Sequence, residues 1–181
     1  MNRAEHVVLA LRQANARVAV AESLTGGLIS AAITSVPGSS AVFAGSVVTY
    51  EVATKSTILG VDPKGLARTG PVDVTVARQM AEGVARLFST PFAVATTGVA
   101  GPQPHGGFPA GVVIIGWFAQ GETGAVSGQF QGDRVQVRDQ ATRAALHTVT
   151  QCVLYGQVRD EVLPRSDHFP SAGINGNEYG R

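Results

Sequence analysis

The amino-acid sequence predicts an α/β protein, a three-layer α/β/α sandwich built over a mixed, mostly parallel sheet of about five strands. Apolar runs typical of strands alternate along the chain with segments of helical periodicity, and such alternation is typical of α/β folds. One pair of neighbouring runs is separated by the turn-rich residues 121–124, which predicts an antiparallel hairpin. The 181 residues are 44% hydrophobic, which is enough to bury the core of one domain.

The boundaries of the expected helices follow from capping residues. Asn2, with Glu5 three residues later, forms a capping box that begins a helix reaching about residue 15. Asp133 and Gln136 begin the last long helix in the same way, and Asp73 caps a helix before it. The other expected elements are a short helix from residue 62, a helix over 26–35 and strands over 17–21, 41–50, 92–97, 112–119 and 125–131.

One domain is expected over residues 1–158, followed by a tail over residues 159–181. The tail has no helical or strand periodicity and is rich in Pro, Gly, Asn and Ser, which predicts a flexible segment or an arm that binds a partner. Within the domain, the run 41–50 is apolar almost throughout, so we expect a strand that is buried on both faces.

Composition and charge argue against several classes of partner. The net charge is +1 and no cluster of Lys and Arg stands out, so nucleic acid is not an expected partner. No long apolar span or signal-like start is present, so no membrane association is expected. The single Cys152 fits a reducing cytoplasm, and the four histidines lack ligand spacing, so we expect neither a metal site nor a cofactor.

Residues 21–27, Ala-Glu-Ser-Leu-Thr-Gly-Gly, lie between a predicted strand and a predicted helix. This layout places the Ser23 hydroxyl near a helix N-terminus, where backbone N–H groups and the helix dipole favour negative charge. Ser23 could therefore be a nucleophile whose oxyanion is held by backbone amides, or the turn could cradle a phosphate. In the simplest interpretation the Ser/Thr pair only caps the helix and the glycines only form the turn.

Polar residues also follow the next predicted strands. Tyr50 ends one strand and Lys55 comes shortly after it; burial there would lower the pKa of the lysine until it can accept a proton, unless it is an ordinary surface lysine. Thr97 and Gly98 end another strand, at the sheet edge where α/β proteins place ligand contacts. The Gly- and Pro-rich loop 102–109 that follows is either a lid or a loop that tolerates insertions.

Two arginines lie one turn apart at the start of the last helix. Arg134 and Arg138 occupy a position that is unfavourable for cations, because the positive end of the helix dipole lies there. The pair therefore indicates an anionic partner. The alternative is an ordinary ion pair with Asp133 or Asp139.

Five blocks of the sequence, in order, resemble the CinA C-terminal domain family, whose characterised members include the nicotinamide-nucleotide amidases. The resemblance covers residues 4–155 and leaves out the tail. The large N-terminal domain of many CinA proteins is absent, so a stand-alone chain of the amidase type is expected. The matching blocks are residues 21–27, residues 45–50 with Lys55, residues 80–83, residues 97–102, and residues 132–134 with Arg138.

This resemblance implies an amidohydrolase that converts nicotinamide mononucleotide into nicotinic acid mononucleotide and ammonia. By position, Ser23 would be the nucleophile, Lys55 the base that activates it and Tyr50 an assisting residue. The partner is then this small-molecule substrate, and a homo-oligomer in the cytoplasm with no cofactor is expected. The residues expected to bind the oxyanion or the substrate are Thr25, Gly26, Gly27, Thr97, Gly98, Gly101 and Arg134.

The chain departs from the family pattern at positions that face the expected substrate. Val52 stands where family members commonly have asparagine, Leu24 stands where they often have cysteine, and the loop 103–110 lacks the usual acidic and lysine residues. A hydrolase of another small amide or nucleotide therefore stays an alternative. A non-catalytic nucleotide-binding or protein-interaction module is a second alternative, although such a module has no need of Ser23 together with Lys55.

Overall fold

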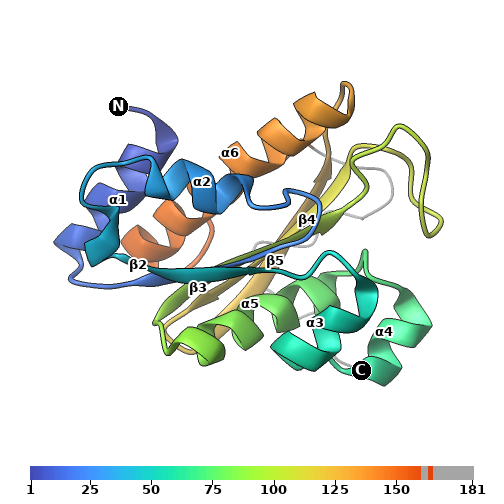
Figure 1. The fold of residues 1–181 in the computed structure, drawn as a ribbon, viewed down its shortest axis with the longest axis horizontal. Helices are drawn as coiled ribbons and strands as arrows, with labels where there is room; N and C mark the ends of the chain where they lie inside the picture. Colours follow the sequence, from blue (N-terminus) through green and yellow to red (C-terminus); the bar gives the residue numbers. More distant parts are fainter. Residues whose placement is uncertain (160–162, 165–181) are drawn as a thin grey trace.

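A computed structural model describes residues 1–159 and 163–164 of the chain. It has one five-stranded sheet in the order β2-β1-β3-β4-β5, covered by helices on both faces, as the α/β/α prediction requires (Figure 1). The expected tail lies almost wholly outside the described residues, so the domain boundary at residue 158 stays a prediction. The strands are β1 (Val18–Glu22), β2 (Phe43–Val48), β3 (Phe92–Gly98), β4 (Val112–Ala119) and β5 (Glu122–Gln129).

The sheet is mixed, and its parallel part carries the residues of interest. Strand β1 lies between β2 and β3 and runs parallel to both. Strand β4 is antiparallel to β3 and to β5, so four of the five strands point in the same direction although only two of the four pairings are parallel. The carboxyl ends of β1, β2 and β3 therefore meet at one edge of the sheet, at the right-hand end in Figure 1.

Each face of the sheet has its own core. Val18 and Val20 of β1 pack with the helices of one face, whereas Ala19 and Ala21 pack with those of the other. The alternation of side chains along a strand produces this division. Helices α1 (Arg3–Gln13), α2 (Leu28–Thr34) and α6 (Arg134–Tyr155) cover the first face, and α3 (Val52–Leu59), α4 (Pro63–Thr69) and α5 (Val74–Phe88) cover the second.

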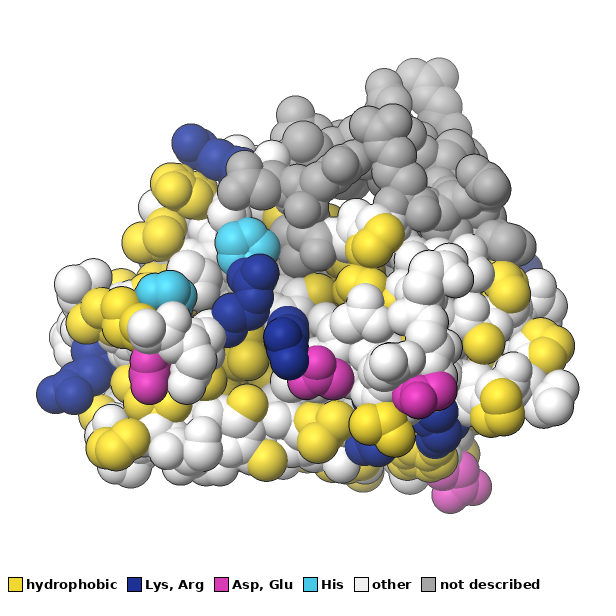
Figure 2. Space-filling model, turned by 90° about the horizontal axis from the view of Figure 1, so that it is seen from above, with side chains coloured by type: hydrophobic (Ala, Val, Ile, Leu, Met, Phe, Trp, Pro, Cys, Tyr) yellow, Lys and Arg dark blue, Asp and Glu magenta, His cyan; other side chains and the backbone are white. Residues whose placement is uncertain are grey.

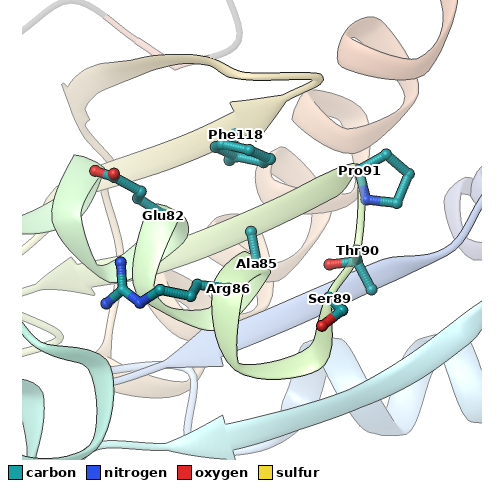
Figure 3. Close-up of a pocket in the computed structure, with 7 residues that line it drawn as sticks. All are labelled: Glu82, Ala85, Arg86, Ser89, Thr90, Pro91 and Phe118. Atoms are coloured by element: carbon teal, nitrogen blue, oxygen red, sulfur yellow. The ribbon is translucent and has the colours of Figure 1, made fainter.

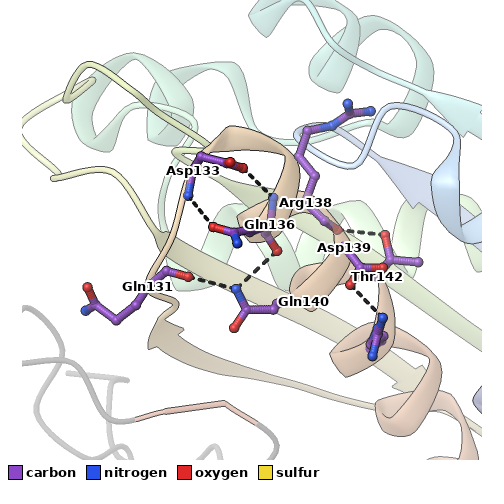
Figure 4. Close-up of polar contacts among 8 residues, drawn as sticks. Gln131, Asp133, Gln136, Arg138, Asp139, Gln140 and Thr142 are labelled. Atoms are coloured by element: carbon purple, nitrogen blue, oxygen red, sulfur yellow. Dashed lines mark hydrogen bonds and ion pairs between the residues drawn. The ribbon is translucent and has the colours of Figure 1, made fainter.

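The capping signals in the sequence are confirmed. Asn2 and Glu5 form the expected capping box of α1, and Asp133 and Gln136 form that of α6 (Figure 4). Asp73 accepts hydrogen bonds from the first amides of α5, as expected. These caps satisfy amides that a helix leaves without partners at its N-terminus.

Two expectations about the strands are wrong in detail. Strand β2 is an edge strand and is only half-buried, because no other strand of the described residues pairs with its outer side; the apolar run 41–50 had predicted burial on both faces. The turn of the hairpin lies at Gln120 and Gly121, both with positive φ, and β5 begins at Glu122. A two-residue turn of this kind matches the twist of the strands better than the expected turn at 121–124.

Helix α3 is a further element, which the sequence pattern did not predict. Its residues Val52, Thr54, Thr57 and Ile58 are β-branched and favour helix weakly, and Glu51 provides no side-chain cap. The helix ends at Gly60, whose φ of 73° is the left-handed conformation common after helices. Its presence matters because it carries Lys55.

Lys and Arg side chains form no large patch on the face of the molecule seen in Figure 2. Lys and Arg side chains there are few and lie among acidic, apolar and other side chains. Among the helices of residues 1–159, none combines the length and the apolar character needed to cross a membrane.

Candidate active site

The site lies at the end of the sheet where the carboxyl ends of β1, β2 and β3 meet. Glu22, the last residue of β1, is paired in register with Val48 of β2 and Thr96 of β3. The Ser23 amide donates to the Thr96 carbonyl oxygen at 3.1 Å, and the Thr49 amide donates to the Glu22 carbonyl oxygen at 2.9 Å. The chain segments that leave β1 and β2 are therefore held side by side.

Lys55 contacts Ser23 directly. Its Nζ donates a hydrogen bond to Ser23 Oγ at 3.1 Å and another to the Thr49 carbonyl oxygen at 2.5 Å. The lysine is 1% exposed, so the alternative of an ordinary surface lysine is wrong. Burial lowers the pKa of Lys55 from 10.5 to about 8, because the charged form loses its hydration. No carboxylate within the described part of the chain forms an ion pair with it.

Helix α5 fixes the helix that carries Lys55. Arg86 donates from Nη2 to the carbonyl oxygen of Leu59, the last residue of α3, at 3.0 Å. Gly83 faces the same carbonyl group, and any Cβ at this position would collide with it. The close approach of the two helices therefore depends on glycine, and it holds the end of α3 four residues beyond the lysine.

The N-terminus of α2 is capped by Glu22. The buried carboxylate accepts hydrogen bonds from the amides of Gly27, Ile29 and Ser30 at 2.9, 3.1 and 3.0 Å, and from Ser30 Oγ at 2.6 Å. The interpretation of Ser23 as a helix cap is therefore wrong. These helix amides are also occupied, so they are not available to cradle a phosphate.

The turn after β1 leaves two amides without a partner among the described residues, those of Leu24 and Thr25. The Gly26 amide donates to the Ser23 carbonyl oxygen at 3.1 Å, and the Gly27 amide belongs to the Glu22 cap. Of the three amides that the sequence suggests for an oxyanion, the turn therefore leaves that of Thr25 available.

Thr25 also has a side-chain partner that the sequence did not indicate. Its Oγ1 lies 2.8 Å from Oγ1 of Thr96, and both threonines are fully buried. This contact ties the turn after β1 to β3. In the sequence, the only indication of this contact is that Thr96 directly precedes the Thr97-Gly98 pair at the end of the predicted strand.

The expected substrate residues on the β3 side are engaged in packing. Thr97 is buried, and its hydroxyl donates to the Pro71 carbonyl oxygen at 2.7 Å. A Cβ on Gly98 would collide with the Val112 carbonyl group. Gly101 has a φ of 86°, and its carbonyl oxygen accepts a hydrogen bond from Arg134. Contact of these residues with a ligand stays a prediction.

Arg134 joins two segments around the site. Its Nη2 donates to Tyr50 Oη and its Nη1 to the Gly101 carbonyl oxygen, both at 2.9 Å. Tyr50 is 60% exposed, and its hydroxyl has no hydrogen bond to Ser23 or Lys55 in the part of the chain described. Arg134 therefore lies at the rim of the site, and the proposed assistance by Tyr50 stays a prediction.

The ion-pair interpretation of the two arginines is wrong. Asp139 pairs with Arg143 at 2.9 Å, and Asp133 caps α6 (Figure 4). Arg138 points away from this cap and donates to the carbonyl oxygens of Leu24 at 2.9 Å and of Thr25 at 2.8 Å. The sequence showed that Arg138 matches the family, but nothing in its spacing indicated this contact.

The loop 102–109 forms a small hairpin that projects from the sheet (Figure 1). His105 and Phe108 exchange two backbone hydrogen bonds of 3.0 Å around Gly106 and Gly107, both with positive φ. The Phe108 side chain packs on a hydrophobic cluster beneath the loop, while His105 is exposed. Phe108 therefore anchors the loop to the domain, whereas the ring of His105 is exposed to solvent.

A hollow of about 540 Å³ lies at the other end of the sheet, where β3 begins (Figure 3). It is far from Ser23, which follows the opposite end of the parallel strands. Its lining residues are Glu82, Ala85, Arg86, Ser89, Thr90, Pro91 and Phe118. The residues that the structure describes contain no group of His, Cys, Asp and Glu that could hold a metal ion.

Known proteins of similar sequence carry two kinds of name. A CinA-like protein of Frankia casuarinae is 41% identical over 167 residues, which is 92% of this chain but 38% of that protein. The chain spans little more than a third of the length of most curated relatives that it matches. The nicotinamide-nucleotide amidohydrolase PncC of Pseudomonas putida is 45% identical over 144 residues, which cover 78% of this chain and 89% of that protein.

Solved structures agree with the sequence comparison. A crystal structure of a CinA superfamily protein from Klebsiella pneumoniae matches with a TM-score of 0.81 and 30% identity, covering 86% of this chain and 99% of that one. A protein from Agrobacterium tumefaciens matches with a TM-score of 0.76 and 35% identity, covering 80% and 90%. The sequence model of the CinA C-terminal domain matches residues 1–153. The chain therefore belongs to the CinA C-terminal domain family.

Proposed function

We propose that this protein is an amidohydrolase that converts nicotinamide mononucleotide into nicotinic acid mononucleotide and ammonia. The observation that supports this most is the hydrogen bond of 3.1 Å between Lys55 Nζ and Ser23 Oγ, made by a buried lysine whose pKa is lowered to about 8. A nucleophile beside a base is the minimum that hydrolysis of an amide needs. The name of the Pseudomonas putida relative supports this choice of substrate.

The first half of the reaction forms an ester. Neutral Lys55 accepts the proton of Ser23 Oγ while the oxygen attacks the carboxamide carbon. The carbonyl oxygen becomes an oxyanion, which the unpartnered amides of Leu24 and Thr25 stabilise. Protonated Lys55 then returns its proton to the amide nitrogen, the carbon–nitrogen bond breaks, and ammonia leaves.

The second half hydrolyses the ester. Lys55 accepts a proton from water, which attacks the ester carbon, and the same amides hold the second oxyanion. The bond to Ser23 Oγ breaks and the oxygen regains its proton from Lys55, so the enzyme returns to its starting state. Arg134 at the rim of the site is the candidate for contact with the 5′-phosphate, because a guanidinium group suits phosphate oxygens.

The test is ammonia release by the purified protein from nicotinamide mononucleotide, with the acid product identified by chromatography. Nicotinamide, nicotinamide riboside and a set of unrelated carboxamides are assayed in parallel. Preference for the mononucleotide supports the proposal. Turnover of another amide in preference would support the alternative of a different small-molecule hydrolase, and binding without turnover would support a non-catalytic module.

The pH dependence of activity follows from the pKa of Lys55. The base must be neutral, and protonation below about pH 8 removes it. We expect kcat/KM to rise about tenfold per pH unit below pH 8 and to level off above it. A profile that is flat between pH 6 and 9, in a protein whose melting temperature is unchanged over that range, would show that Lys55 is not the base.

The loop 102–109 is proposed to close over the nicotinamide ring of the substrate and to determine which amides the enzyme accepts as substrates. We expect His105→Ala to raise KM for nicotinamide mononucleotide several-fold with little change in stability, because His105 is exposed. Phe108→Ala should instead lower the melting temperature, because its ring packs on the cluster below. Glu122→Ala, at the far end of the sheet, is the control. Unchanged kinetics of His105→Ala for every substrate tried would contradict the lid.

A further inference from the structure

We propose that Arg138 is a positioning residue that aims the amides after Ser23 at the oxyanion of the reaction. This inference rests on the nucleophilic role proposed for Ser23. It assigns to Arg138 a function within the protein, whereas the sequence indicated contact with an external anion.

The contacts of Arg138 are made with one short segment. Nε donates to the Leu24 carbonyl oxygen at 2.9 Å, and Nη2 donates to the Thr25 carbonyl oxygen at 2.8 Å. The side chain is half-buried, and no carboxylate in the described ranges pairs with it. Its charge is therefore directed at two successive peptide groups, and hydrogen bonds from a charged donor are stronger than neutral ones.

These bonds fix the direction of the Thr25 amide. In a trans peptide the C=O and the following N–H point in opposite directions, and the bond between Leu24 and Thr25 is trans. Arg138 reaches the turn from α6, on one face of the sheet, whereas Lys55 reaches it from α3, on the other face. Holding the Leu24 carbonyl group toward α6 therefore turns the Thr25 N–H away from α6, toward the face from which Lys55 approaches.

A second clamp completes the turn. Glu22 holds the amide of Gly27, and the Gly26 amide closes the turn onto the Ser23 carbonyl oxygen. Arg138 thus holds the carbonyl groups of Leu24 and Thr25, and Glu22 holds the amide at the end of the turn. The donors that remain have a fixed direction before substrate binds, and such preorganisation is what makes an oxyanion site effective.

Arginine is suited to this position by its geometry. Its rigid fork reaches two carbonyl oxygens at once, whereas a lysine ammonium would keep the charge but could not hold both planes in the same way. Arg138→Lys and Arg138→Gln therefore separate the geometry from the charge. Arg143→Met, an exposed arginine on the same helix that pairs only with Asp139 among the described residues, is the matched control.

The kinetic test compares these variants on nicotinamide mononucleotide. We expect both Arg138 variants to lose about 100-fold in kcat, with KM changed by less than about threefold, because the amides act only on the oxyanion. Arg143→Met should match the wild type. In a Ser23→Ala background, the Kd for the mononucleotide should be the same with and without Arg138→Lys. A rise in Kd of tenfold or more would show that Arg138 binds the substrate phosphate, and would overturn the proposal.

A second readout is independent of the natural substrate. A fluorophosphonate reagent phosphonylates a nucleophilic serine with loss of fluoride, and negative charge develops on its phosphoryl oxygen in the oxyanion site. We expect labelling of Ser23, measured by mass spectrometry, to be about 100-fold slower in both Arg138 variants than in Arg143→Met. If the wild type is labelled but releases no ammonia, the substrate proposal fails while this inference stands. Labelling at the wild-type rate in both variants, a wild type that is not labelled, or variants that have lost their folded melting transition would overturn it.

Discussion

Ser23→Ala is expected to abolish ammonia release from nicotinamide mononucleotide and to leave the fold intact. The hydroxyl contributes the attacking oxygen, and no other hydroxyl in the described residues is bonded to Lys55. Loss of a nucleophile removes the covalent route altogether, so we expect kcat to fall by at least about 10³-fold. The structural cost is small, because Glu22 and not Ser23 caps α2, and the melting temperature should stay within about 2 °C of the wild type.

The matched control is Ser35→Ala at the other end of α2. Its hydroxyl donates to the Ala32 carbonyl oxygen and lies outside the site, so it should keep the wild-type kcat. Circular dichroism and thermal melts establish that both variants are folded. A Ser23→Ala protein with more than about a tenth of the wild-type activity would show that the serine is not the nucleophile.

The Ser23 turn shows how far a local sequence pattern predicts a site. A strand followed by small and polar residues and then an apolar helix predicted the strand–turn–helix layout around Ser23, because these features act over a few residues. The pattern did not predict what caps the helix. Glu22 belongs to the strand by sequence, and only the fold shows that its carboxylate bends back onto amides five to eight residues later.

For Lys55, the sequence pattern did not predict the helix that carries the residue. The residues near the end of the strand left open whether this lysine is a desolvated base or an ordinary surface residue, and the structure shows that it is buried. The sequence failed to predict α3, because the β-branched residues of that segment have weak helical preference and no capping side chain. Packing against α5 stabilises the helix instead, through Gly83 and through the hydrogen bond from Arg86 to Leu59, and this bond joins residues 27 positions apart and leaves no local trace in the sequence.

Arg138 and Thr96 mark the limit of prediction from sequence. Arg138 meets Leu24 across 114 residues, and Thr96 meets Thr25 across 71. Neither partner can be found from spacing or periodicity, because the meeting depends on the register of β1 with β3 and on how α6 lies against the sheet. The strand order supplies that information, and the site follows from it.

Substitution of Lys55 is expected to remove activity and to change stability in a direction that depends on the new side chain. Lys55→Met and Lys55→Arg should both lower kcat by about 10³-fold or more. Methionine has no basic atom, and a guanidinium group does not give up its proton in the working pH range. An active Lys55→Arg protein would show that position 55 supplies only charge.

Lys55→Met and Lys55→Arg should differ in their free energy of unfolding. A pKa of about 8 in place of 10.5 means that the folded protein disfavours the charged lysine by about 3 kcal/mol at neutral pH. Methionine removes this cost but leaves the Thr49 carbonyl oxygen without its donor, so we expect a net gain of about 1–2 kcal/mol and a melting temperature several degrees higher. Arginine keeps the buried charge and adds volume, so Lys55→Arg should be less stable than the wild type.

The pH dependence of this difference gives the sharpest test of the buried lysine. Below about pH 8 the lysine is charged in both the folded and the unfolded protein, so its cost to the wild type is complete. Between about pH 8 and 10.5 only the folded protein releases the proton, so the stability of the wild type should rise by about 2–3 kcal/mol and overtake that of Lys55→Met. Chemical denaturation at pH 7 and pH 10, with the exposed Lys64→Met as control, measures the gap. A gap that stays constant across this range would mean that Lys55 titrates alike in both states, and that burial has not prepared it to act as a base.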